Sequence, residues 1–364
     1  MCVFAFTVGF GLGGFLVCVD IYYIEFVGTK YRTFIFNMIP PWAIGVMLLG
    51  GVFKWLPNWR YICYANLILG CPALGMIWFC PESIRWLLTQ NRIDETKRTL
   101  DVLAQRNSRP PPDFTKLDSL SSLIEHKTQS KTIINYNYIT LFTNRFACWR
   151  VLVFGYIWFS MAFGYYAITF GIGTLDGDAS INMLLFGVVE IFGQLFLIVI
   201  AKFFGRRWST VMLSLLTSAS LFGVTIAYHT TKNPQIFGTA KTVLALSAKF
   251  FISTTWSSVI LFTMETFPTV IRNTAYGAVS VFGRIGGVCA PQNKALLHIA
   301  PHLPFTFNGG VQLITAILTC FLSDTYSTHL VDHFQCNEDD INQIEKEKGD
   351  EASNTTSLTE AERN

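Results

Sequence analysis

The chain has 364 residues, of which 51% are hydrophobic and only 14% are charged, and its net charge is +3. A soluble protein of this length needs more charge to cover its surface, so the composition excludes an ordinary soluble domain. The apolar residues gather in windows of roughly 20 residues, the length that crosses a bilayer core of about 30 Å. We therefore predict an all-α membrane protein.

Nine such windows follow one another along the chain, and most of them lack the periodic polar positions of a helix in a soluble core. They lie at residues 2–26, 34–53, 61–80, 148–170, 182–203, 209–228, 237–264, 275–297 and 305–324. Pro40 and Pro41 fall inside the second window, where prolines kink membrane helices and free backbone groups toward a cavity.

Two polar segments divide the windows into groups. Residues 81–147 contain a predicted amphipathic helix near 94–105, and residues 327–364 are acidic and rich in Ser, Thr and Asn, a composition typical of disorder. Residues 1–80 and 148–326 are thus predicted to be helical bundles. Residues 81–147 are predicted to be the loop between them, and residues 327–364 a disordered tail.

Basic residues predict which connections face the cytoplasm. Lys and Arg crowd segment 81–147, the connection 171–181 has none, and the next connection contains Lys202, Arg206 and Arg207. The positive-inside rule therefore places 81–147, 201–208, 265–274 and the C-terminal tail in the cytoplasm. The same alternation places residue 1 outside.

An internal repeat relates the two groups of windows. Glu25 and Arg32 follow the first window, and Glu265 and Arg272 follow the seventh, each pair seven residues apart with a threonine at the same interior position. Parallel repeats of six helices are a standard transporter construction. The counterparts of the spans in 148–228 fall before residue 1. We therefore expect nine membrane helices of a twelve-helix fold, with the first three absent.

The cytoplasmic motifs also resemble those of a known family. The run from Pro81 to Leu88 resembles the P-E-S-x-R-W-L motif of the organic cation, organic anion and carnitine transporters of the major facilitator superfamily. Motifs at 58–60, 205–207, 265–273 and 284–291 agree in order and spacing, so the resemblance covers about residues 1–325. The family's first three helices and its large extracellular loop are absent. Residues Leu322–Thr325, which follow the last window, are a degraded form of the family's P-E-T-K motif.

This resemblance implies a major facilitator fold and secondary transport of a small organic ion across the plasma membrane. The coupling ion stays unknown. Charged residues at the cytoplasmic helix ends can pair across the two bundles when the inside is closed, which predicts a gating role; alternatively, they only mark the membrane boundary. The predicted gating residues are Glu25, Arg32, Glu82, Arg85, Arg206, Arg207, Glu265 and Arg272.

Three charges inside the windows are candidates for substrate binding, because charges at membrane depth cost several kcal/mol and are usually functional. They are Glu190, Lys249 and Arg284. The alternative is a buried ion pair of Glu190 with Lys249 or Arg284 that only fixes the packing of the bundle.

Aromatic residues add a second binding feature. Trp158, Tyr165 and Tyr166 share the fourth window, and Trp256 lies two turns from Lys249 on the same face. Aromatic faces attract organic cations and stack on planar anions, although such a stripe also serves ordinary helix packing.

The charge of the substrate depends on Arg284. The resemblance places this residue at a position that is acidic in organic cation carriers and arginine in anion and carnitine carriers. An arginine holds a carboxylate by two parallel hydrogen bonds. Arg284 and Lys249 give the site two cations and Glu190 gives it one acid. We therefore predict that the substrate is an organic anion or a zwitterion such as carnitine.

Other activities find little support. Gly9, Gly11 and Gly14 match a dinucleotide fingerprint, but they lie inside an apolar window and indicate close helix packing. We predict no enzyme, cofactor, metal site or nucleic-acid partner. The competing hypotheses are a non-transporting truncated relative, an organic cation carrier, and a channel or receptor.

Overall fold

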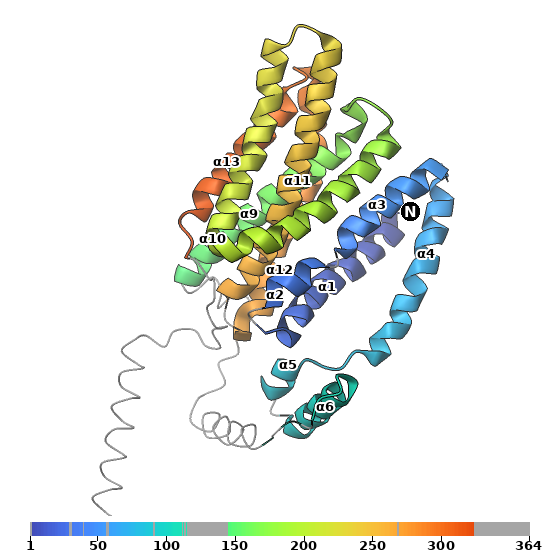
Figure 1. The fold of residues 1–364 in the computed structure, drawn as a ribbon, viewed down its shortest axis with the longest axis vertical. Coiled ribbons are helices and arrows are strands. Elements are labelled where there is room, and N and C mark those ends of the chain that lie inside the picture. Colours follow the sequence, from blue (N-terminus) through green and yellow to red (C-terminus); the bar gives the residue numbers. More distant parts are fainter. Residues whose placement is uncertain are drawn as a thin grey trace, which may run out of the picture.

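The computed structural model describes residues 2–28, 31–38, 40–55, 58–89, 92–110, 112, 114, 145–267 and 269–323. All regular elements in these ranges are helices, which confirms the all-α prediction. They form an N-terminal helix set, α1 to α4, and a C-terminal helix set, α9 to α13, side by side in Figure 1. The predicted tail at 327–364 lies outside the described residues.

The N-terminal helix set follows the first three apolar windows. It consists of α1 (Cys2–Phe26), α2 (Arg32–Met38), α3 (Pro41–Trp55) and α4 (Trp59–Met76), and the 3₁₀ turn η2 (Ile77–Phe79) ends it. The second window is interrupted between α2 and α3. Proline has no N–H to donate to a preceding turn, so the helix stops before Pro40 and Pro41 and restarts there.

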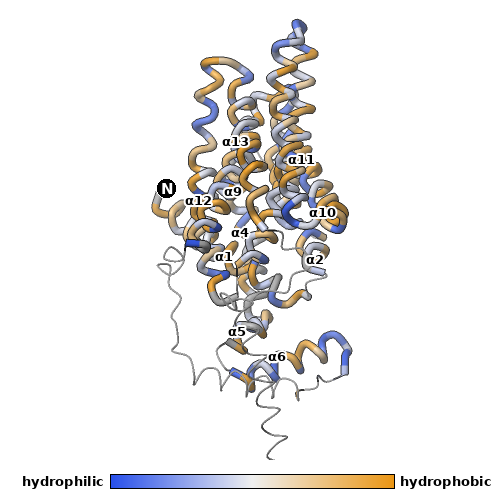
Figure 2. The backbone as a smooth tube through the Cα atoms, turned by 90° about the vertical axis from the view of Figure 1, so that its left-hand side faces the viewer, coloured by the Kyte–Doolittle hydropathy of each residue, from blue (hydrophilic) through white to orange (hydrophobic). Residues whose placement is uncertain are grey.

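Segment 81–147 begins with two short helices. These are α5 (Ile84–Thr89), which the sequence did not predict, and α6 (Ile93–Arg106), which confirms the predicted amphipathic helix. Both lie beyond the lower end of the long helices in Figure 1. Figure 2 shows hydrophilic and hydrophobic residues alternating along α6, unlike the mostly hydrophobic long helices.

The C-terminal helix set begins with α9 (Arg145–Phe170) and the 3₁₀ turn η3 (Ile172–Thr174), which lead to α10 (Ala179–Thr230). The 52 residues of α10 would extend about 78 Å if straight, far more than one bilayer crossing. Gly205 breaks the helix with φ 69° and ψ −174°, a conformation that essentially only glycine adopts. Figure 1 shows the chain reversing within α10, which matches the two predicted windows 182–203 and 209–228.

Three further helices complete this set: α11 (Pro234–Thr266), α12 (Thr269–Cys289) and α13 (Leu303–Thr319). The helix predicted from the window 275–297 was wrong at both ends. The α-helix α12 begins six residues earlier, and the 3₁₀ helix η4 (Ala290–His298) follows it. Pro291 opens η4, because proline cannot continue the α-helical hydrogen bonds. The last helix ends at Thr319, five residues before its predicted end.

In the part of the chain that the structure describes, five helical segments are suited by length and composition to cross a membrane: Val3–Tyr22, Thr33–Trp55, Cys148–Phe170, Ala179–Thr230 and Pro234–Thr266. The fourth contains two spans because of the break at Gly205, and Leu303–Thr319 is apolar but shorter. The protein is therefore an integral membrane protein, and the exact number of spans stays a prediction.

The two helix sets meet where α3 packs on α10 and α1 packs on α12. Glycines allow the first contact to be close. A Cβ atom added at Gly50 would lie 2.7 Å from the backbone nitrogen of Leu184, and one added at Gly187 would lie 2.5 Å from the backbone nitrogen of Met47. Small residues at such crossings let membrane helices approach to backbone contact.

We predict that Gly50→Ala lowers the melting temperature of the detergent-solubilised protein relative to Gly51→Ala. Both changes gain the same helix propensity, about 1 kcal/mol. Only the first forces α3 away from α10, because nothing lies within 4 Å of a Cβ at Gly51. Overpacking of this kind costs about 1–3 kcal/mol. Equal melting temperatures for the two variants would show that the helices can separate freely.

Candidate substrate-binding site

A buried ion pair joins two of the three predicted membrane charges. Lys249 of α11 lies 2.9 Å, Nζ to Oε1, from Glu190 of α10, and both side chains are essentially inaccessible to solvent. From the sequence alone, Lys249 and Arg284 were both possible ion-pair partners of Glu190. The structure pairs Glu190 with Lys249 and not with Arg284. A substrate-binding role for the two residues stays a prediction, but each now has a partner in the same helix set.

Further hydrogen bonds surround this pair. The hydroxyl of Tyr165 donates to Glu190 Oε1 at 2.8 Å, and Lys249 Nζ donates to Thr169 Oγ1 at 2.8 Å and lies 3.1 Å from the centroid of the Tyr165 ring. The indole N–H of Trp42 donates to the Tyr165 hydroxyl at 2.7 Å. Because Trp42 belongs to α3, this bond connects the buried pair with the N-terminal helix set.

The predicted aromatic residues form one cluster. The rings of Trp158 and Trp256 are 5.7 Å apart, those of Tyr165 and Tyr166 are 5.4 Å apart, and Tyr165 lies 6.1 Å from Trp256. Tyr276 of α12 joins at 5.1 Å from Trp158. Trp158 also donates a hydrogen bond to Thr263 Oγ1 at 3.0 Å, which fixes its ring and supports a packing role for that residue.

A fourth membrane charge, Asp20, was missed at the sequence level. It lies on α1, where its Oδ2 atom accepts a hydrogen bond of 2.6 Å from the hydroxyl of Tyr276 on α12. This bond crosses between the two helix sets. A charged residue within the apolar window 2–26 was the available signal for it.

Arg284 lies on α12 with its side chain exposed. Within the described ranges it forms neither an ion pair nor a hydrogen bond. The same helix carries Tyr276, which contacts Trp158 of the aromatic cluster and Asp20 of the other helix set, and Gly287, which lies against the Tyr166 ring.

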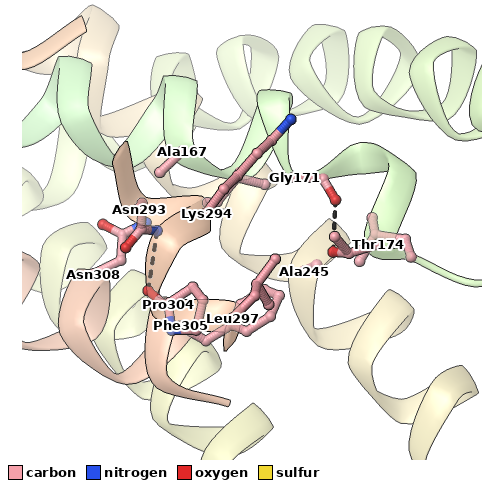
Figure 3. Close-up of a pocket in the computed structure, with 12 residues that line it drawn as sticks. Ala167, Gly171, Thr174, Ala245, Asn293, Lys294, Leu297, Pro304, Phe305 and Asn308 are labelled. Carbon is pink, nitrogen blue, oxygen red and sulfur yellow. Dashed lines mark hydrogen bonds between the residues drawn. The ribbon is translucent and has the colours of Figure 1, made fainter. Parts of the chain in front are cut away.

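A small pocket lies elsewhere, between the ends of α9 and α11, η4 and the start of α13 (Figure 3). None of the predicted binding residues lines it. Its volume of about 30 Å³ suits a water molecule rather than an organic ion. The Oδ1 atoms of Asn293 and Asn308 are buried there without a hydrogen-bond partner in the described part of the chain, which fits such a water.

The predicted gating residues lie at helix ends, as expected. Arg206 binds Glu265 through two hydrogen bonds of 3.1 Å in a nearly buried pair, and Arg272 Nε donates to the carbonyl of Met264 at 2.8 Å. Arg207 donates to the carbonyl of Cys320. These contacts lie within the C-terminal helix set.

In the N-terminal helix set, the hydroxyl of Ser83 donates to Glu25, and Glu82 is exposed between η2 and α5. Arg32 begins α2 and Arg85 lies in α5, but their side chains are outside the described part. Pairing across the two bundles stays a prediction. For the residues described, the geometry shows how each helix end is held within its own set.

Comparisons with known proteins agree with this architecture. Residues 1–337 match the family "Sugar (and other) transporter". Solute carrier family 22 member 7 of mouse is 30% identical over 330 residues, 90% of this chain and 59% of that protein. Human solute carrier family 22 member 13 is 28% identical and is covered to 54%. The chain thus spans about 60% or less of the length of these relatives.

Solved structures support the fold. The proton:xylose symporter XylE of the major facilitator superfamily, bound to 6-bromo-6-deoxy-D-glucose, superimposes with a TM-score of 0.65 at 17% sequence identity, covering 85% of this chain and 68% of that one. A partially occluded inward-open form of XylE from E. coli gives a TM-score of 0.58 at 16% identity.

The family match and the fold define the class to which the chain belongs, a family of membrane transporters within the major facilitator superfamily, whose members are carriers of small molecules and not enzymes. More narrowly, the chain belongs to the sugar (and other) transporter family, and its similarity to members of solute carrier family 22 confirms the resemblance seen in its cytoplasmic motifs.

We predict that Lys249→Met sharply lowers the melting temperature and the folded yield, and that the double change Glu190→Gln/Lys249→Met restores much of both. The single change leaves a buried carboxylate without its cation, which costs about 3–5 kcal/mol, whereas a neutral pair does not carry this cost. Thermal unfolding of purified protein measures the effect.

Lys241→Met is a matched control on α11, because Lys241 donates to the neutral carbonyl of Thr174 and its loss leaves no buried charge. A single Lys249→Met variant as stable as this control would refute the structural role. If the double variant is stable but does not transport, the pair also serves function.

Proposed function

We propose that the protein is a secondary active carrier that moves a small organic anion or zwitterion across the plasma membrane by alternating access. The observation that supports this most directly is the state of Arg284: of the two cations considered for substrate binding, Lys249 and Arg284, it is the one without an ion pair among the described residues. Lys249 already neutralises Glu190. Arg284 is therefore the group with binding capacity left for a carboxylate.

The surroundings of Arg284 suit an organic substrate. Tyr166 is half-buried next to it on α9, and a Cβ atom at Gly287, one turn along α12, would lie 3.2 Å from the Tyr166 ring. Aromatic faces beside a guanidinium give an apolar contact for the body of the substrate and a planar donor group for its carboxylate. Such combinations are typical of ligand sites with few, precisely placed polar groups.

The two helix sets supply the moving parts. Alternating access in this superfamily is largely the rocking of one bundle against the other around a central site. Among the described residues, the helix sets meet through the α3–α10 and α1–α12 contacts, where Trp42 donates a hydrogen bond to Tyr165 and Tyr276 donates one to Asp20. The Arg206–Glu265 pair and its neighbours hold the helix ends that would move as units.

We predict that Arg284→Gln lowers uptake of a labelled carboxylate, 5,5-dimethylhexanoate, by about tenfold to a hundredfold. Hydrogen bonds to a charged group contribute about 1.5–3 kcal/mol, and each 1.4 kcal/mol is a factor of ten. Uptake into proteoliposomes that contain the purified chain measures the effect, with tetraethylammonium as the cation for comparison.

Arg150→Gln is the matched control, since Arg150 is exposed near the start of α9, away from the aromatic cluster. It should transport like the unchanged protein, and Arg284→Lys should keep part of the carboxylate uptake. Undiminished carboxylate uptake by Arg284→Gln would overturn the proposal. So would a wild-type preference for tetraethylammonium.

A further inference from the structure

We propose that Asp20 is a substrate-selecting residue, whose carboxylate binds the positively charged end of a zwitterion while Arg284 holds its carboxylate. This inference rests on the proposed function and narrows it to molecules that carry both charges. It also changes the charge count of the site. The sequence suggested two cations, Lys249 and Arg284, and one acid, Glu190. With Asp20 the site contains two cations and two acids.

Asp20 lies inside the apolar segment Val3–Tyr22, where an ionisable group is costly to place unless it has a role. The partner that the structure gives it is the hydroxyl of Tyr276, at 2.6 Å. A hydroxyl donates one hydrogen bond but brings no positive charge. The carboxylate is therefore held in a defined position without being neutralised by direct contact with a cation in the described part of the chain.

The two acid–base combinations of the site differ in geometry. Glu190 and Lys249 are in direct contact at 2.9 Å, whereas Asp20 is bound to Tyr276 of α12 and forms no ion pair with Arg284 of the same helix. Two opposite charges that are not paired with each other leave separate places for a cation and an anion, and a zwitterion provides both.

The spacing indicates the kind of zwitterion. Tyr276, which holds Asp20, and Arg284 are eight residues apart on α12, about 12 Å along the helix axis. The long arginine side chain shortens this separation, so the charges of the ligand should be several bonds apart, unlike those of an α-amino acid. Near Asp20, the Trp158 ring packs 5.1 Å from Tyr276. Aromatic rings beside an acid favour a quaternary ammonium group.

Two probes of equal size separate the charges. γ-Butyrobetaine carries a trimethylammonium group and a carboxylate, and 5,5-dimethylhexanoate replaces the nitrogen by carbon and keeps only the carboxylate. We predict that the purified chain in lipid nanodiscs binds the betaine more tightly, by isothermal titration calorimetry. Asp20→Asn should weaken betaine binding at least tenfold and change binding of the carbon analogue less than twofold.

Several variants make the result specific. Asp20→Glu keeps the charge and should retain the preference for the betaine. Asp94→Asn removes an exposed acid on α6 and should leave both affinities unchanged. Should Asp20→Asn fail to fold, as judged by size-exclusion chromatography, Asp20→Ser is the second neutral variant.

An equal loss for both probes, or no loss for either, would overturn the assignment of Asp20. A loss of preference in Asp20→Glu as complete as in Asp20→Asn would do the same. Arg284→Gln must weaken both probes. If it does not, the proposed function fails; if it does while the Asp20 variants show no selective loss, only the present inference fails. A wild-type chain that binds neither probe overturns both.

Discussion

The buried ion pair of Glu190 and Lys249 is the interaction on which the C-terminal helix set depends. Neither charge reaches solvent, so each requires the other, and α10 and α11 must pack in the register that brings them within 2.9 Å. Tyr165 and Thr169 of α9 satisfy further hydrogen-bonding groups of the pair. Three helices are thereby held around one neutralised centre. Loss of either partner would leave a buried charge uncompensated, which is more costly than replacing both residues by neutral ones.

The fixed centre gives the neighbouring charges a different role. Lys249 is already paired with Glu190, whereas Arg284 has no ion pair in the described part of the chain, and Asp20 is an acid of the opposite helix set. Arg284 and Asp20 lie on helices, α12 and α1, that belong to different sets. In the proposed transport cycle their distance would change whenever the sets rock, which would link the shape of the proposed binding site to the conformation of the protein.

Hydrophobic windows, helix breakers and charge patterns were enough to predict most helices. The break at Gly205 followed from two windows around a basic turn, and α6 from its amphipathic period. Ends such as that of α12 were wrong because a 3₁₀ segment is as apolar as an α-helical one. In the site, whether Glu190 pairs with Lys249 or with Arg284 depends on how each helix is rotated about its axis. An apolar window in the sequence does not specify this rotation. The contacts of Trp42 and Tyr276 likewise exist only between helix sets that are distant in sequence.

The strengths of these contacts differ in a way that suits movement. Bonds that join the helix sets, from Trp42 to Tyr165 and from Tyr276 to Asp20, each have an uncharged donor. A typical hydrogen bond contributes only about 0.5–1.5 kcal/mol net, and one to a charged group about 1.5–3. The ion pairs Glu190–Lys249 and Arg206–Glu265 lie within one set, and breaking either would expose or strand a charge. In the proposed transport cycle, rocking of the sets would therefore break the bonds between them and leave the charged pairs intact. Differential binding of a substrate by a few kcal/mol would then be sufficient to shift the balance between the two conformations.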